Sequence, residues 1–247
     1  MRMGKQILLR PLGIIIIAIV WQIAGTLNES PALPPLSQIM ATLFTLIRDG
    51  TYNRHINASL QVVLLGIGFA SAFGFILGVL MFRYDNFKTS VQPVIESIRG
   101  VPALTLFPLL IVLFGLGTFS RVFVIFWTAY PAVVLSTINS LNIDTSVVDA
   151  ARTSGSGEWR IIYSIRIPMA TQGIITGLRI GVGGGWIGLV AAEMLGATRG
   201  LGHFLLWSAQ SFQFDRVYAT IIVIAFIGGM MNWVLLFIQK LLLKVTE

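Results

Sequence analysis

The chain has 247 residues, of which 55% are hydrophobic and only 11% are charged, and its mean hydropathy is +0.84. Soluble domains carry roughly 25% charged residues, so this composition argues against a soluble domain and predicts a polytopic membrane protein. The net charge is +7, but the basic residues lie at the ends of apolar runs, which is typical of membrane topology rather than nucleic-acid binding. With no cysteine and only two histidines, we expect no catalytic residue, metal site or disulfide.

Six apolar runs have about the length that a helix needs to cross a membrane. A bilayer core of about 30 Å requires about 20 apolar residues in a helix. The runs cover residues 11-27, 58-82, 93-116, 120-141, 171-192 and 217-239. We therefore expect an all-α polytopic membrane protein with six transmembrane helices, forming a single domain over residues 1–247.

The distribution of basic residues predicts the orientation of these helices. Alternate connectors lie on opposite sides, and one side receives Arg48, Arg54, Arg121, Arg199 and Arg216. The other 12 of the 17 basic residues share a side with both termini and the segment around 142-170. Positive charge is retained in the cytoplasm, so this side is expected to be cytoplasmic. The basic start before the first run also fits a cleaved signal peptide, but no convincing cleavage site follows, and a retained helix is favoured.

Prolines and amphipathic spacing characterise the connector after the first run. Prolines at 31, 34 and 35 exclude a helix interior there and predict an extracytoplasmic connector. Beyond it, Ile39, Leu43 and Leu46 recur at helical spacing among polar residues. This pattern predicts a short helix that lies along the outer surface.

Small residues recur every four positions in two of the runs. The stripes are Gly66, Ala70, Gly74 and Gly78, and then Gly177, Gly181 and Gly185. Such stripes let helix backbones approach closely, so tight helix packing is expected, with an interface that moves during transport as the alternative. Prolines at 102, 108 and 131 predict kinks or breaks in the third and fourth helices.

The largest polar interruption, residues 142-168, contains residues that typically begin and end helices, in the order expected for a helix, a tight turn and a second helix. Asp144 can cap the first helix, and Gly155 can take the left-handed conformation that ends it. Ser156 can begin the second helix, and Pro168 is expected to close the segment. We therefore predict a cytoplasmic helix–turn–helix.

Several side chains of this segment suit contact with a partner protein. Ala150 and Ala151 allow close seating in a groove, and Trp159 and Tyr163 share a helix face as apolar anchors. Three further side chains are expected to pair with acids on that partner or with anionic lipid: Arg152, Arg160 and Arg166.

The spacing of these residues resembles the "EAA" signature of permeases in binding-protein-dependent ABC importers. The matching residues are Asp149-Ala150-Ala151, then Gly155 three residues later, and after nine more residues Ile165-Arg166-Ile167-Pro168. Asp replaces the usual Glu, and Ile the usual Leu before proline.

The resemblance extends over most of the chain. From about Leu33 to Leu242 the chain looks like the nitrate, sulfonate, taurine and bicarbonate branch of this family. The segments that carry this likeness are Ser59-Leu60, Phe114-Gly-Leu-Gly117, Gly177-Leu-Arg179, Trp186, Ala191-Ala-Glu193 and Gly200-Leu-Gly202. Val62 departs from an arginine that is frequent in the family.

The resemblance implies a homodimer in the bacterial inner membrane. Each copy would dock a cytoplasmic ATPase through the segment 142-168, and an extracytoplasmic binding protein would deliver a small anion. Taurine or another aliphatic sulfonate is favoured, with nitrate, bicarbonate and small aromatic acids as alternatives. ATP and Mg would bind the partner ATPase, and no cofactor is expected in this chain, which lacks the G-x-x-x-x-G-K-[ST] phosphate loop.

Three residues of the fifth predicted helix are candidates for the translocation path or its gate, with Glu193 directly after the apolar run: Arg179, Trp186 and Glu193. Arg179 and Glu193 are 14 residues apart, about 21 Å along a helix, so they cannot pair. Arg179 is favoured as a cytoplasmic anchor or a partner of the loop, and Glu193 as a structural or gating contact near the outer surface. For Trp186, pore lining, lipid contact and packing remain open.

Two other classes of protein compete with this interpretation. An ion-driven secondary transporter would show repeated halves and buried acids in its spans, neither of which is evident. An intramembrane serine enzyme would use Ser154 or Ser156 with His203, but the predicted topology puts them on opposite sides of the membrane.

Overall fold

The computed structural model describes residues 2–28, 30–143 and 146–246, and all regular elements in these ranges are helical. Asp144, the expected helix cap, lies outside the described residues. The elements are α1 (Arg2–Leu27), α2 (Leu36–Arg48), α3 (Thr51–Arg83), α4 (Asp85–Arg99), α5 (Ala103–Phe114), α6 (Thr118–Leu141), α7 (Ser146–Thr153), α8 (Glu158–Ile161), the π-helical turn η1 (Ile162–Arg166), α9 (Ile167–Gly196), α10 (Leu201–Gln210) and α11 (Phe214–Thr246).

Helix α6 forms the centre of the fold and packs most extensively against α3 and α9. The two predicted stripes of small residues form these contacts. A Cβ atom on Gly74 would lie 2.8 Å from the Cβ of Val133 in α6, and one on Gly181 would lie 3.0 Å from the carbonyl oxygen of Ala129. Both glycine faces therefore allow close approach to α6, as the spacing predicted.

Four helices are long and apolar enough to cross a membrane: α3, α6, α11 and the continuous helix Glu158–Gly196. A fifth span exists if α4 and α5 are counted together, although they meet at an angle of 94°. The third predicted run, 93-116, is therefore not one straight helix. Pro102 lacks an amide donor and restrains the residue before it, which explains why the helix breaks there, whereas Pro108 and Pro131 lie within α5 and α6.

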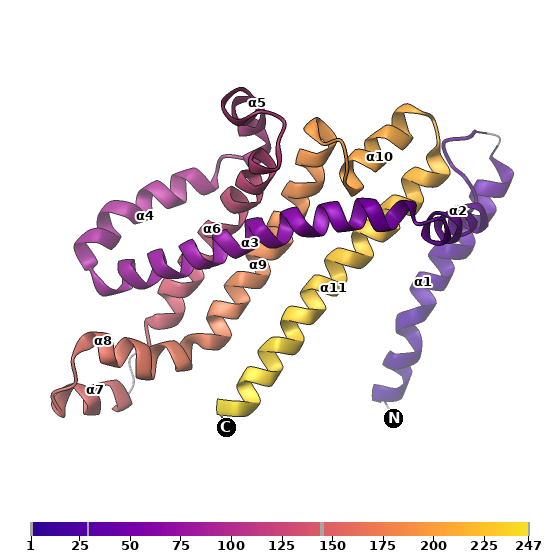
Figure 1. The fold of residues 1–247 in the computed structure, drawn as a ribbon. Helices are drawn as coiled ribbons and strands as arrows, with labels where there is room; N and C mark the ends of the chain where they lie inside the picture. Colours follow the sequence, from indigo (N-terminus) through magenta and orange to yellow (C-terminus); the bar gives the residue numbers. More distant parts are fainter. Residues whose placement is uncertain (1, 29, 144–145, 247) are drawn as a thin grey trace.

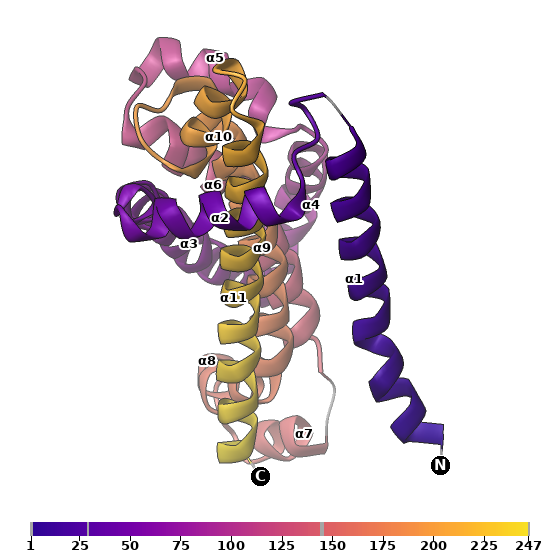
Figure 2. The ribbon, with the colours of Figure 1, turned by 90° about the vertical axis from the view of Figure 1, so that its right-hand side faces the viewer.

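Helix α1 includes the first predicted run but lies apart from the other helices over most of its length (Figures 1 and 2). Its part Ile15–Leu27 is an apolar helix shorter than a full span. A sixth transmembrane helix thus stays a prediction. The connector joins α1 to α2, where the indole of Trp21 donates a hydrogen bond of 3.2 Å to the carbonyl of Pro34.

The predicted amphipathic helix after the connector is confirmed as α2. The side chains of Ile39, Leu43 and Leu46 are buried in the largest apolar core, together with Tyr52 of α3. Buried side chains of three further helices belong to the same core, among them Leu189 of α9, Phe204 of α10 and Val223 of α11. Helix α2 therefore fastens the connector to the helix bundle.

Candidate functional site

Helices α7 and α8 form the hairpin that the sequence predicted between the fourth and fifth runs. Gly155 has φ of 80°, and the amide of Ser156 donates to the carbonyl of Ala151 at 3.0 Å, so a left-handed glycine ends α7. The start of the second helix was predicted wrongly. It begins at Glu158, with Gly157 rather than Ser156 as the residue before its first turn.

The hairpin lies at the same end of the molecule as the described ends of the chain, and α5 and α10 lie at the opposite end (Figure 1). The hairpin and the described chain ends therefore share one side, as the basic residues predicted, and the assignment of that side to the cytoplasm stays a prediction. The arrangement also separates Ser154 and Ser156 of the hairpin from His203 of α10, so no serine–histidine pair forms.

An ion pair connects the two helices of the hairpin across its turn. The Nε of Arg152 lies 2.9 Å from the Oε1 of Glu158, and both side chains are partly exposed. Exposed pairs of this kind contribute about 0–1 kcal/mol, so the pair orients the two helices more than it stabilises them. Arg152 was expected to pair with a partner protein or lipid; in this structure it pairs within the hairpin.

The two aromatic anchors stack on each other but differ in exposure. The rings of Trp159 and Tyr163 lie 5.8 Å apart, and the indole also contacts Tyr84 at the end of α3, with ring centroids 6.4 Å apart. Trp159 is partly buried, whereas 61% of Tyr163 is exposed. Trp159 thus fastens the hairpin to α3, and Tyr163 is the anchor that a partner can reach.

Most of the other residues of the predicted coupling segment are exposed as well. Asp149, Ala150, Arg160 and Pro168 are exposed, and Ala151 is partly buried. Small residues and an exposed aromatic ring in one hairpin are suited to contact with a protein partner.

Arg166 is buried, contrary to the expectation that it would meet a partner or lipid. Only 3% of it is exposed, and its Nη1 donates to the carbonyls of Leu141 at 2.7 Å and Ile143 at 2.8 Å. Its guanidinium also lies 5.0 Å from the ring centroid of Phe82. The last carbonyls of a helix lack intrahelical partners, and a cation there is favourable, so Arg166 joins the hairpin to the end of α6.

Pro168 does not close the segment. The turn η1 runs directly into α9, and Glu158–Gly196 forms one continuous helix of 39 residues. Pro168 stands in the first turn of α9 directly after η1, where the wider π-helical turn accommodates the missing amide donor. The hairpin is therefore a direct extension of a spanning helix.

The three predicted path residues all lie on α9 but in different surroundings. Arg179 donates to Asn232 and Gln239 of α11, and its predicted role as a cytoplasmic anchor or a partner of the loop stays a prediction. Trp186 is buried, and its indole donates to the carbonyl of Ile224 at 3.2 Å. In this structure, Trp186 packs between α9 and α11, and its role in transport stays a prediction.

Glu193 is fully buried in a hydrogen-bonded cluster at the end of α9 opposite the hairpin. Its carboxylate accepts from the hydroxyl of Ser59 at 2.8 Å and from the amide of Gly202 at 2.9 Å. The amide of Leu201 donates to the same hydroxyl at 2.9 Å, so the N-terminus of α10 faces the carboxylate. A side chain on Gly200, where φ is 126°, would collide with Glu193.

Sequence analysis missed the partners within this cluster. Ser59 and Glu193 are separated by 134 residues, and no local periodicity connects them. The available signal was an acid directly after an apolar run, because a carboxylate that becomes buried there requires hydrogen-bond donors from other parts of the chain.

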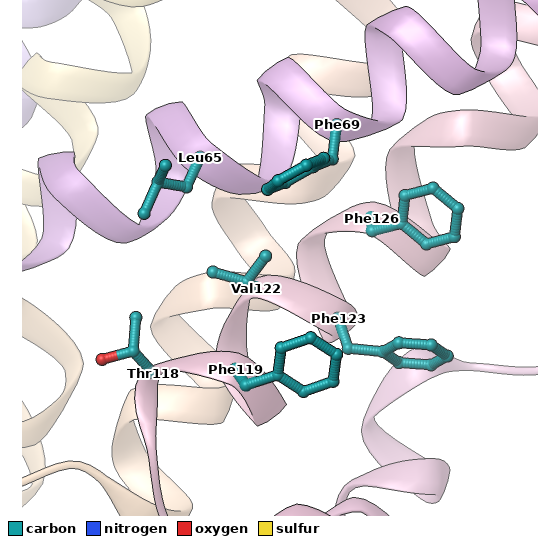
Figure 3. Close-up of a pocket in the computed structure, with 7 residues that line it drawn as sticks. All are labelled: Leu65, Phe69, Thr118, Phe119, Val122, Phe123 and Phe126. Carbon is teal, nitrogen blue, oxygen red and sulfur yellow. The ribbon is translucent and has the colours of Figure 1, made fainter.

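An apolar pocket of about 430 Å³ lies between α3 and α6 (Figure 3). It is lined by Leu65, Phe69, Thr118, Phe119, Val122, Phe123 and Phe126. Only Thr118 offers a polar group, so the pocket suits an apolar occupant rather than an anion. Within the described residues, no three of His, Asp and Glu gather in a way that could hold a metal ion.

The chain is similar to known proteins in sequence and in fold. The family model for the inner membrane component of binding-protein-dependent transport systems matches residues 70–245. The taurine transport system permease protein TauC of Escherichia coli (strain K12) is 32% identical, over 92% of this chain and 85% of that protein. The nitrate import permease protein NrtB of Synechocystis sp. is 28% identical, over 97% and 90% of the two chains. In fold, the chain is similar to the MetNI methionine ABC transporter in its native crystal form, with a TM-score of 0.70 over 82% of this chain and 98% of that chain, at 16% identity.

Proposed function

Because the chain belongs to the family of inner membrane components of binding-protein-dependent transport systems, we propose that it is the membrane-spanning subunit of an ATP-driven importer for a small anion. The names of TauC and NrtB refer to taurine and nitrate, which both carry negatively charged oxygens. Taurine or another aliphatic sulfonate is favoured, because TauC is the more similar of these two relatives; nitrate and bicarbonate are the alternatives.

The observation that carries the proposal is the exposed α7–α8 hairpin. Its turn depends on a left-handed glycine, Ala150 and Tyr163 are both exposed on it, and its second helix continues into a spanning helix. We assign this face to a cytoplasmic ATPase that holds ATP and Mg. The end of the molecule with the hairpin and both termini is then cytoplasmic, and an extracytoplasmic binding protein meets the end that holds α5 and α10.

The proposed mechanism is alternating access in a pair of copies. ATP binding brings the two ATPases together and moves the two hairpins with them. Since each hairpin is continuous with α9 and is joined to α6 by Arg166, its displacement turns these spans and opens the path to the outside. The higher affinity of ATP for the outward-open state drives the switch to that state. ATP hydrolysis then returns the pair to the inward-open state.

Purification of the chain with its co-encoded partners tests this function. We expect an ATPase subunit to copurify, and we expect ATP hydrolysis in liposomes to rise when the loaded binding protein is added. Comparing taurine, ethanesulfonate, nitrate and bicarbonate as cargoes identifies the anion. If no ATPase copurifies from a folded preparation, the proposal is wrong.

The hairpin turn provides a matched pair of variants. Gly155 has open space around its Cβ position, so a side chain there meets no neighbour, and only its positive φ resists substitution. Gly155→Val places a β-branched residue in the left-handed region, whereas Gly155→Asn adds a side chain of similar size that tolerates it. We expect the valine variant to lose ATPase binding and the asparagine variant to retain it, as measured by copurification at equal membrane expression. Normal binding and uptake in the valine variant would contradict the docking assignment.

A further inference from the structure

Arg179 is a cation in the middle of a spanning helix. It lies 12 residues after the start of α9 at Ile167 and 17 residues before its end at Gly196. At about 1.5 Å per residue, these distances are about 18 Å and 26 Å along the helix. A charged side chain at such a depth is costly in lipid and is normally found facing a water-filled path or a partner charge.

The guanidinium of Arg179 is held in place without being neutralised. Its Nε donates to the Oδ1 of Asn232 at 3.1 Å, and its Nη1 donates to the Oε1 of Gln239 at 3.4 Å. Both acceptors are neutral amides, and no carboxylate among the described residues lies within 4.0 Å of the guanidinium. Two of its five N–H donors are used in this way, so three donors and the positive charge remain for a ligand.

Hydrogen bonds through Gln239 connect this cation to a polar groove between α9 and α6. The Nε2 of Gln239 donates to the carbonyl of Gln172 at 3.3 Å and to the hydroxyl of Thr176 at 3.4 Å, so α11 and α9 are joined by amides and hydroxyls. Gln172 and Thr176 also line a groove of about 430 Å³, whose other polar lining residues are Ser136, Asn139 and Ser140.

The polar surface is at odds with a lipid environment. Polar side chains on three spanning helices, with a cation among them, gain nothing from contact with acyl chains. The apolar pocket between α3 and α6, in contrast, has the chemistry expected of a lipid-facing or protein-facing surface. The groove between α6 and α9, together with the polar residues that join α9 to α11 beside it, is therefore the surface of this chain best suited to a hydrated path.

We propose that Arg179, oriented by Asn232 and Gln239, binds the oxyanion group of the cargo during its passage along this groove. The guanidinium supplies the charge and parallel N–H donors that sulfonate or nitrate oxygens accept, and the amide side chains fix its direction. The hydroxyls and amides of the groove then replace water around the anion as it moves toward the cytoplasm. This inference rests on the proposed function, because it requires the groove to face the path between two copies.

The phosphate of an anionic lipid has the same chemistry and is the competing source of the ligand. A lipid headgroup would bind Arg179 whether or not cargo is present, and its effect would vanish in membranes without anionic lipid. A transported anion would require Arg179 in membranes of any composition. The two sources can therefore be separated by the composition of the vesicles.

The test uses the complete complex, with its ATPase and binding protein, in phosphatidylcholine vesicles with and without phosphatidylglycerol. We expect Arg179→Gln to lower taurine or nitrate uptake by at least about tenfold while the ATPase still copurifies, because a charged hydrogen-bonded contact is lost. Arg179→Lys keeps the charge and should recover part of the uptake. Arg48→Gln makes the same change at an exposed arginine of α2, which does not line the groove, and should leave uptake unchanged.

Each outcome separates the hypotheses. If Arg179→Gln transports as well as the unmodified chain, or if its defect appears only with phosphatidylglycerol, the anion subsite is wrong while the proposed function stands. If the unmodified complex transports no anion, the proposed function itself fails. Should Arg179→Gln not assemble, bromide soaked into crystals of the unmodified complex provides the second measurement: an anomalous peak beside the guanidinium supports the subsite, and its absence there contradicts it.

Discussion

Glu193 is held by hydrogen-bond donors from two other helices. Its carboxylate accepts from Ser59 of α3 and from Gly202 of α10, and it is fully buried. The acid at the end of an apolar run was predicted to make a structural or gating contact, and the structure shows what it contacts. The gating role, in which this contact opens during transport, stays a prediction.

Removing this carboxylate should destabilise the protein strongly. Glu193→Ala leaves the Ser59 hydroxyl and the Gly202 amide buried without their acceptor, at a cost of about 1–3 kcal/mol for each unpaired group. Glu158→Ala removes an exposed carboxylate and should change the free energy of unfolding by no more than about 1 kcal/mol. Thermal unfolding of the detergent-solubilised chain compares the two. Equal midpoints would show that the cluster does not stabilise the fold.

At the scale of helices, the glycine face of α3 sets its distance from α6. Gly74 and Gly68 both lie in α3, but a Cβ on Gly74 would meet the Cβ of Val133 at 2.8 Å, whereas one on Gly68 has nothing within 4 Å. We expect Gly74→Ala to destabilise the protein by about 1–3 kcal/mol through overpacking. Gly68→Ala should be neutral or slightly stabilising, since alanine favours a helix. Denaturant titration of both variants checks this, and a neutral Gly74→Ala would mean that α3 and α6 separate freely.

The elements also show what a sequence can and cannot predict. Periodicity located the glycine faces, the amphipathic α2 and the turn at Gly155, because each depends on residues within a few turns of one another. The sharp bend between α4 and α5 was indicated only as a kink at Pro102, since its angle depends on how both helices pack on their neighbours. The burial of Arg166 was missed because its acceptors, Leu141 and Ile143, lie more than twenty residues earlier in the chain.

At the scale of the whole molecule, the hairpin is joined to the spanning helices at three places. It continues through η1 into α9, Trp159 contacts Tyr84 at the end of α3, and Arg166 donates to the end of α6. A movement of the hairpin is therefore transmitted to three spans that are themselves packed together along α6. In the proposed cycle, the exposed surface of the hairpin binds the ATPase, and its attachment to α3, α6 and α9 turns the spanning helices.

Arg166 should therefore couple ATP hydrolysis to uptake rather than bind the ATPase. Arg166→Met keeps an unbranched apolar side chain beside Phe82 but removes the donors to the α6 carbonyls, so the hairpin can move without turning α6. We expect the ATPase to copurify as before, while the amount of anion imported per ATP hydrolysed falls several-fold. Arg160→Met changes an exposed arginine in α8 and should instead alter ATPase affinity, with the coupling ratio retained. An unchanged ratio in Arg166→Met, with only a lower unfolding midpoint, would limit Arg166 to stabilising the end of α6.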